Sequence, residues 1–176
     1  MTPEALAAAM HIKTVRAGLW AAPITLAMDE YEIDTPARQA AFLAQVGHES
    51  GGLAYVREIW GPTPAQVRYE GRLDLGNTQP GDGFKFMGRG LIQVTGRDNY
   101  DKAGRALGLP LTTDPDLLAE PRNAARSAGW FWFSHGCNAL ADSGQFQLLT
   151  RRINGGLNGL PDRETRWAWA KEVLGA

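Results

Sequence analysis

The sequence predicts a mainly α-helical fold with one small β-hairpin. Apolar residues recur every three or four positions over most of the 176 residues, as they do along one face of a helix. Several of these runs begin at a hydroxyl residue followed by proline or end at glycine, which are helix start and stop signals. Only one stretch has the short apolar runs around glycines that suit strands.

The first two helices are expected at the N-terminus. An Ala-rich helix should cover Pro3–Met10, and a second should run from Leu19 to about Tyr31. Pro23 then falls in the first turn of the second helix, where its missing N–H costs no hydrogen bond.

The third helix has clear end signals. Thr35 is a good N-cap, and Pro36 suits the first helical position. A stripe of alanines with Phe42 follows, and Gly51 and Gly52 are expected to end the helix.

The middle and the C-terminal part alternate between loop and helix. Gly and Pro predict mostly loop over Gly61–Gly83. Phe84–Met87 and Leu91–Thr95 read as the two strands of the hairpin. We expect further helices over Arg97–Leu107, Glu120–Ser134, Gly144–Ile153 and Pro161–Leu174. No internal repeat or linker is found, so residues 1–176 are expected to form one domain.

Composition excludes several classes of protein. Lys and Arg number 18 against 19 Asp and Glu, and a net charge of −1 gives no broad field for nucleic acid. Met10–Arg16 resembles a helix-turn-helix only superficially and lacks a basic face. Cys137 is the only cysteine, so no internal disulfide and no Cys-based zinc site is possible. The uncharged run Ala17–Met28 has 12 residues, too few for a membrane span.

His48 and Glu49 are the first candidates for chemistry. A zinc protease pattern would need a second His one turn later, but position 52 is Gly52, so we expect neither a metal nor another cofactor. Glu49 borders the apolar face formed by Phe42 and Val46, and partial desolvation there would raise its pKa, as a general acid needs. A solvated Glu near a helix end is the plainer interpretation.

Glu58 is a candidate partner for Glu49. On an unbroken helix the nine-residue spacing would turn it away, but the glycines let the chain return and place it on a facing wall. Two carboxylates across a cleft perform glycoside hydrolysis. Glu70 competes for this role, and Glu58 as a surface ion-pair residue is the simpler alternative.

Polar side chains after the glycine-rich segment could contact a sugar. Gln93 and Thr95 share one strand face, although Thr95 could instead cap the next helix in a box with Asp98. Asn154 either ends a helix or presents an amide at a cleft. The consecutive aromatic residues 130–133 cannot share one face, so most should be core, with one free to reach a sugar.

These segments together resemble a known family. Gly47–Gly52, Gly88–Thr95, Asn99-Tyr100 and Ile153–Gly156 are similar to motifs of the glycoside hydrolase family 19 chitinases. The likeness is closer to the short phage and prophage endolysins of that family. It runs from about Thr35 to the C-terminus, with four motifs in the right order.

The resemblance implies a lysozyme-like, mainly helical fold with a deep substrate cleft and an inverting mechanism. It implies Glu49 as general acid and Glu58 as general base, with Thr95 in place of a serine that helps to hold the attacking water. The remaining implied contacts are with substrate: His48, Gln93, Asn99, Asn154 and Arg163. Arg166 is the alternative to Arg163 for the arginine of the cleft.

The expected substrate is the peptidoglycan glycan strand, because the chain shows no secretion signal and no cysteine framework. We therefore expect a monomeric muramidase-type endolysin, made in the host cytoplasm without a signal peptide and acting on the cell wall after release. We expect neither nucleic-acid binding nor stable membrane insertion. A chitinase acting on chitin oligomers and a non-catalytic glycan-binding module are the alternatives.

Overall fold

Helices make up most of the computed structural model, which describes residues 1–176 and confirms the mainly α-helical, lysozyme-like class. Ten α-helices and two 3-10 helices occur. In chain order they are α1 (Pro3–Met10), α2 (Thr14–Glu30), α3 (Pro36–Glu49), α4 (Pro64–Val67), η1 (Leu73–Leu75), α5 (Asp82–Lys85), α6 (Arg97–Leu107), η2 (Pro115–Ala119), α7 (Pro121–Ser134), α8 (Cys137–Asp142), α9 (Phe146–Asn154) and α10 (Leu160–Leu174).

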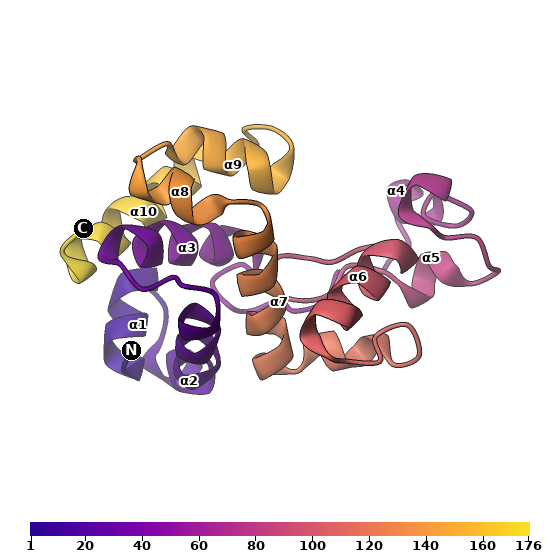
Figure 1. Ribbon diagram of the computed structural model, residues 1–176, viewed down its shortest axis with the longest axis horizontal. Coiled ribbons are helices and arrows are strands. Elements are labelled where there is room, and N and C mark those ends of the chain that lie inside the picture. Colours follow the sequence, from indigo (N-terminus) through magenta and orange to yellow (C-terminus); the bar gives the residue numbers. More distant parts are fainter.

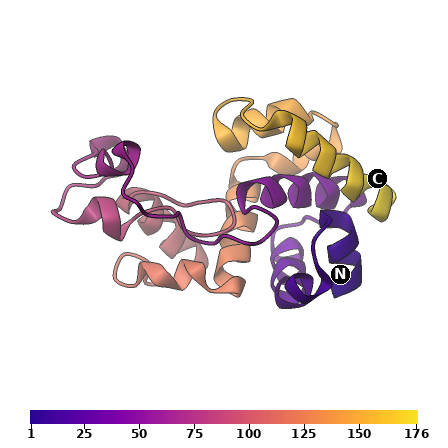
Figure 2. The same cartoon turned by 180° about the vertical axis from the view of Figure 1, so that it is seen from behind.

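The helices gather into two lobes with α7 between them (Figure 1). α3 lies inside the larger lobe, which holds the N-terminal helices together with α8, α9 and α10, and α3 packs most extensively on α10. The smaller lobe holds α4, α5 and α6, and the view from behind shows the same division (Figure 2). Both termini lie in the larger lobe, so the chain leaves it after α3 and returns through α7.

Each lobe buries its own apolar core. The larger core includes Phe42, Trp132 and Leu149, and Phe42 meets Trp132 edge-on at 5.3 Å between ring centroids. The smaller core is built around Phe86 and Tyr100, both fully buried. The aromatic residues of α7 divide between these surroundings, because Trp132 is buried, Trp130 and Phe131 are half-buried and Phe133 is exposed.

The second helix is longer than its sequence pattern predicts. It begins at Thr14, so Pro23 lies inside the helix and not in its first turn. Ala17 and Trp20 are buried on the face that also carries Ile24, and this packing extends the helix by five residues toward the N-terminus. No helix is long and apolar enough to cross a membrane.

The predicted β-hairpin does not form. Phe84 belongs to the short helix α5, and residues 91–93 form a turn. Only two isolated antiparallel bridges remain, and both use Arg89: one joins it to Arg57 and the other to Val94. The sequence pattern missed this arrangement because the pairing with Arg57 joins segments about thirty residues apart.

Several short helices lie where the sequence predicts a loop or where it predicts no helix or strand. α4, η1 and α5 lie in or next to the predicted loop 61–83, and α8 and η2 were not expected. Helices this short gain little from local propensity, so packing decides them. The other predicted helices are confirmed, with ends shifted by no more than two residues.

Candidate active site

Glu49 is the last residue of α3, and its position follows from how that helix begins and ends. The Thr35 hydroxyl accepts a hydrogen bond from the Arg38 amide at 3.2 Å, as predicted for an N-cap. After Glu49 the backbone turns sharply, with positive φ at Gly51, Gly52 and even Leu53. The chain therefore leaves the helix abruptly.

The Glu49 carboxylate is held by Arg163 of α10. Arg163 Nη2 donates to Glu49 Oε1 at 2.5 Å, and Arg163 is only 2% exposed. The same guanidinium donates to Gln45 Oε1 and, at 3.1 Å, to the Asn158 carbonyl. The sequence predicts that Glu49 borders an apolar face, but the structure places its carboxylate at the end of a buried polar network.

Arg163, and not Arg166, is the arginine that contacts Glu49. Arg166 Nε instead donates to Asp162 at 2.8 Å. His48 reaches the same carboxylate, with its Nδ1 2.7 Å from Asp162 Oδ2. Although burial raises the pKa of Asp162, the hydrogen bonds from Arg166 and His48 outweigh it, and the pKa is lowered overall.

Asn154 lies beside this network. It is the last residue of α9, and its side-chain amide donates to the Asn158 carbonyl at 3.2 Å. That carbonyl is the one that Arg163 contacts, so Asn154 and Arg163 hold the same turn between α9 and α10. Asn154 is thus linked to Glu49 through the Asn158 carbonyl and the Arg163 side chain.

Glu58 is held in the other lobe by three donors. Gln66 Nε2 and the Tyr69 hydroxyl donate to Oε1 at 3.0 and 3.3 Å, and the Gly88 amide donates to Oε2 at 3.1 Å. The Glu58 amide in turn donates to the Gly88 carbonyl at 2.9 Å. Burial, followed by the nearby Glu58 charge, raises the pKa of Tyr69.

Glu70 has a structural role. Its two carboxylate oxygens accept hydrogen bonds from the amides of Gly81 and Gly83, at 2.7 and 2.8 Å. Both oxygens are therefore used to close the loop before α5. This geometry favours Glu58 over Glu70 as the partner of Glu49.

Gln93, Thr95 and Asn99 come together along one pocket of about 240 Å³. Gln93 lies so close to Gly88 that a Cβ there would meet its Oε1 at 2.4 Å, which places Gln93 next to the residue that binds Glu58. The Thr95 hydroxyl does not cap α6, whose N-cap is Gly96, so the alternative role of Thr95 in a capping box with Asp98 does not occur. Asn99 donates to the Thr95 carbonyl at 2.8 Å.

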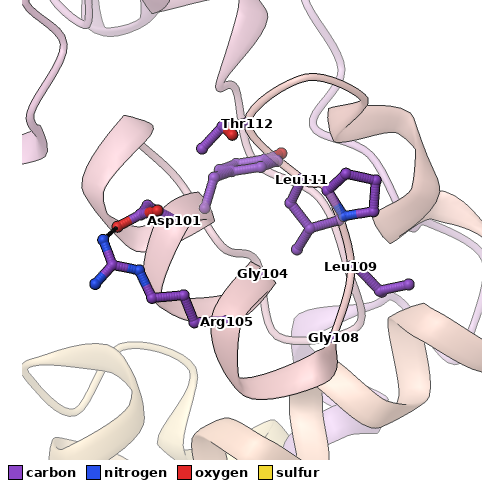
Figure 3. A pocket seen from close by; sticks show the side chains of 9 residues that line it. Asp101, Gly104, Arg105, Gly108, Leu109, Leu111 and Thr112 are labelled. Atoms are coloured by element: carbon purple, nitrogen blue, oxygen red, sulfur yellow. Dashed lines mark hydrogen bonds and ion pairs between the residues drawn. The ribbon is translucent and has the colours of Figure 1, made fainter.

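Another pocket, of about 390 Å³, lies between α6 and the loop 108–112 (Figure 3). Asp101 and Arg105 form an ion pair at its edge, and Tyr100 forms part of its wall. None of the predicted catalytic or sugar-binding residues lines it. It is therefore not the candidate site.

Sequence reasoning missed four residues that build the site: Gln45, Gln66, Tyr69 and Asp162. Gln66 had a usable signal, since Thr63-x-x-Gln66 is a capping box and the structure forms it. Gln45 sits in the apolar stripe of α3, where a fully buried amide points to a buried partner. No group of three or more His, Cys, Asp or Glu side chains is placed to hold a metal ion.

Comparisons with known proteins agree with this fold and site. Residues 31–142 match the family model described as chitinase class I, of glycoside hydrolase family 19. A glycosyl hydrolase family 19 domain-containing protein of Haemophilus influenzae is 35% identical over an alignment of 153 residues, and the alignment covers 72% of this chain and 74% of that protein. An endochitinase of Arabidopsis thaliana is 44% identical over 118 residues, 66% of this chain but only 39% of that protein.

The solved structures give the same result. Chitinase C from Streptomyces griseus HUT6037 superposes with a TM-score of 0.72 at 29% identity, over 90% of this chain and 71% of that chain. The family model and these relatives show that the mainly helical chain is a glycoside hydrolase. More particularly, the chain belongs to glycoside hydrolase family 19, and its substrate is a polysaccharide.

Proposed function

We propose that this chain hydrolyses the β-1,4 glycosidic bonds of peptidoglycan by an inverting single displacement, with residues 1–176 acting as one catalytic domain. The observation that carries the proposal is the pair of carboxylates held on separate lobes. Glu49 is fixed by Arg163, while Glu58 is fixed by Gln66, Tyr69 and Gly88. Inverting enzymes separate their carboxylates by roughly 6.5 to 9.5 Å to admit a water molecule.

Glu49 acts as the general acid in this mechanism. It gives its proton to the glycosidic oxygen while the bond from that oxygen to the anomeric carbon breaks. Arg163 then stabilises the carboxylate that forms. Because Arg163 is also bound to Gln45 and to the Asn158 carbonyl, it keeps its place while Glu49 changes protonation state.

Glu58 acts as the general base. All three of its partners are donors, so the carboxylate is oriented as an acceptor, ready to take a proton from water. That water attacks the anomeric carbon on the face opposite the leaving group, which inverts the configuration. Thr95 holds the attacking water, and Gln93 and Asn99 bind the sugar along the pocket they share.

Two features favour peptidoglycan as the substrate. Glu58 lies only nine positions after Glu49, so the connection between the two carboxylates is short. The only cysteine, Cys137, is buried and cannot form the internal disulfides that a secreted chitinase usually carries. We infer a monomer that is made in the cytoplasm and reaches the cell wall after release.

Cleavage of chitin is the second candidate. The Arabidopsis relative, 44% identical over the matched segment, is described as an endochitinase. Chitin and peptidoglycan share β-1,4-linked N-acetylated sugars, so the same two carboxylates could cleave either polymer.

Mass spectrometry of digestion products separates the two candidates. Purified peptidoglycan and chitin oligomers are digested by the wild-type protein and by Glu49→Gln in parallel. We expect fragments with new reducing N-acetylmuramic acid ends from the wild type, and none from the variant, which should still bind the glycan. Turnover by Glu49→Gln would overturn the acid assignment, and cleavage of chitin oligomers alone would make the protein a chitinase.

A further inference from the structure

The pocket that holds Gln93, Thr95 and Asn99 continues onto α7 and carries chemistry that cleavage does not use. Its opposite wall is formed by Trp130, Phe131 and His135. The two walls come from segments about thirty residues apart, joined where α6 packs on α7. A ligand in this pocket would therefore contact both walls.

Positive charge lines this continuation. Lys102 lies one turn after Asn99 on α6, is exposed and lines the pocket without forming an ion pair. Asp98, one turn before Lys102, lies instead against Gly76. No acidic residue lines the pocket. The Lys102 ammonium group is therefore free to bind an anion.

Arg152 lies next to His135 at this end of the pocket. His135 Nδ1 lies 2.8 Å from the Phe131 carbonyl, which can only accept, so Nδ1 carries the proton and Nε2 is left free. The Phe131 ring stacks on the imidazole at 3.9 Å and holds it in place. Arg152 Nη1 donates to the His135 carbonyl at 2.8 Å, so a second permanent positive charge lies next to a residue of the pocket wall, although Arg152 does not line the pocket itself.

Trp130 supplies an apolar wall beside these charges. It is half-buried, lines the pocket, and its indole N–H makes no hydrogen bond within the protein. The indole face can pack on a sugar ring or a methyl group, and its free N–H can donate a hydrogen bond to a polar atom next to that group. The pocket thus combines an aromatic wall with the Lys102 ammonium group.

We propose that this pocket binds a carboxylate carried by the 3-O substituent of a muramyl residue, with Lys102 as the main determinant of specificity. Chitin has only neutral N-acetylglucosamine units, whereas a muramyl residue carries a lactyl group that ends in a carboxylate or continues into a peptide that carries one. Trp130 packs on the apolar part of the substituent, and the Lys102 ammonium group binds its carboxylate. This inference rests on the proposed peptidoglycan substrate.

Binding to the Glu49→Gln protein tests the proposal. The probes are three soluble tetrasaccharides: chitotetraose, the alternating N-acetylglucosamine–N-acetylmuramic acid tetramer with free lactyl groups, and the same tetramer carrying dipeptides. Calorimetry at low salt gives their dissociation constants. We expect one or both anionic tetramers to bind about ten times more tightly than chitotetraose. Tighter binding of the tetramer with free lactyl groups would show that the pocket binds the lactyl carboxylate. Tighter binding of the tetramer that carries dipeptides would show that it binds the peptide carboxylate.

Variants then test the role of Lys102. Adding Lys102→Ala should bring the affinity ratio close to one, and Lys102→Arg should restore most of it. Lys13→Ala, which removes an exposed lysine far from the pocket, is the matched control and should keep the full ratio. Equal binding of all three probes, or an equal loss for every probe in Lys102→Ala, would overturn the proposal.

The pocket assignment and the proposed peptidoglycan activity can fail independently of each other. If the wild-type protein cleaves peptidoglycan but Lys102→Ala leaves the ratio unchanged, the pocket assignment fails and the peptidoglycan proposal stands. If the wild type cleaves only chitin oligomers while Glu49→Gln still prefers the anionic tetramers through Lys102, the pocket assignment stands and the peptidoglycan proposal fails.

Discussion

At the residue scale, the structure excludes one of the two roles that the sequence offers for the Thr95 side chain, the helix cap. This side chain could have served the next helix as an N-cap, but Gly96 occupies that position and the Thr95 hydroxyl makes no bond to α6. The hydroxyl instead lines the pocket with Gln93 and Asn99. A hydroxyl group that caps no helix is free to orient a water molecule.

Thr95→Ala should therefore lower kcat by about 10-fold or more, the loss expected for a group that positions a reactant. The Tm should stay within about 1 °C of wild type, because no helix cap is lost. Steady-state kinetics on peptidoglycan and a thermal melt provide the two measurements. Thr95→Ser keeps the hydroxyl and should retain most of the rate, and an unchanged kcat in Thr95→Ala would remove Thr95 from the mechanism.

At the element scale, α3 begins at the cap predicted from the sequence and ends at Glu49, the proposed general acid. The Thr35 cap and the Pro36 start are local signals, and the structure has both. The position of Glu49 relative to Glu58 is not local, since it depends on the turn through Leu53 and on pairing with Gly88. Sequence patterns predicted the helix but could not predict the pairing.

The same distinction explains the errors in the predicted elements. The hairpin was read from apolar runs, yet Arg89 pairs with Arg57 from a distant segment, and Phe84 enters a helix. Arg163 as the partner of Glu49 rests on a buried contact between residues 114 positions apart. The residue types at the site were readable from motifs, whereas their partners were set by tertiary packing.

Thr35→Ala tests the local part of this argument. Loss of the bond from the Thr35 hydroxyl to the Arg38 amide should destabilise the protein by about 1 kcal/mol, as for other N-caps. The midpoint of urea unfolding should fall with an unchanged slope, and kcat should change little because Glu49 lies at the other end of α3. Thr35→Ser should keep the stability. A loss of activity without a loss of stability would contradict this account.

At the scale of the whole molecule, polar contacts hold the tip of the smaller lobe, which carries the partners of Glu58. The Arg97 guanidinium donates to both carboxylate oxygens of Asp82, at 2.8 and 2.5 Å. The Arg97 amide donates to Asn77, which in turn donates to the Tyr69 carbonyl at 2.8 Å. Because Tyr69 binds Glu58, loosening the tip would also loosen the proposed base.

The buried Asp82 carboxylate makes this attachment sensitive to pH. The hydrogen bond from Arg97 is the main cause that lowers the pKa of Asp82, and it outweighs burial. A lowered pKa means that the pair stabilises the fold above the ordinary range of an aspartate, near pH 4, and that this contribution is lost as pH falls through the lowered value. Wild-type stability should therefore fall as the pH drops below about 4.

Asp82→Asn should remove the stabilisation that the Asp82–Arg97 pair gives the fold, together with its dependence on pH. At pH 7 the variant should be less stable by about 1.5 to 3 kcal/mol, the range for a hydrogen bond to a charged group. Its Tm should fall less than that of wild type as the pH is lowered from 5 to 2, because the other carboxylates with lowered pKa values titrate alike in both proteins. Asp74→Asn is the matched control, since its pair with Arg72 is in the same lobe but exposed, and it should leave the curve almost unchanged. Parallel Tm curves for wild type and Asp82→Asn would show that the attachment of the tip does not depend on this pair.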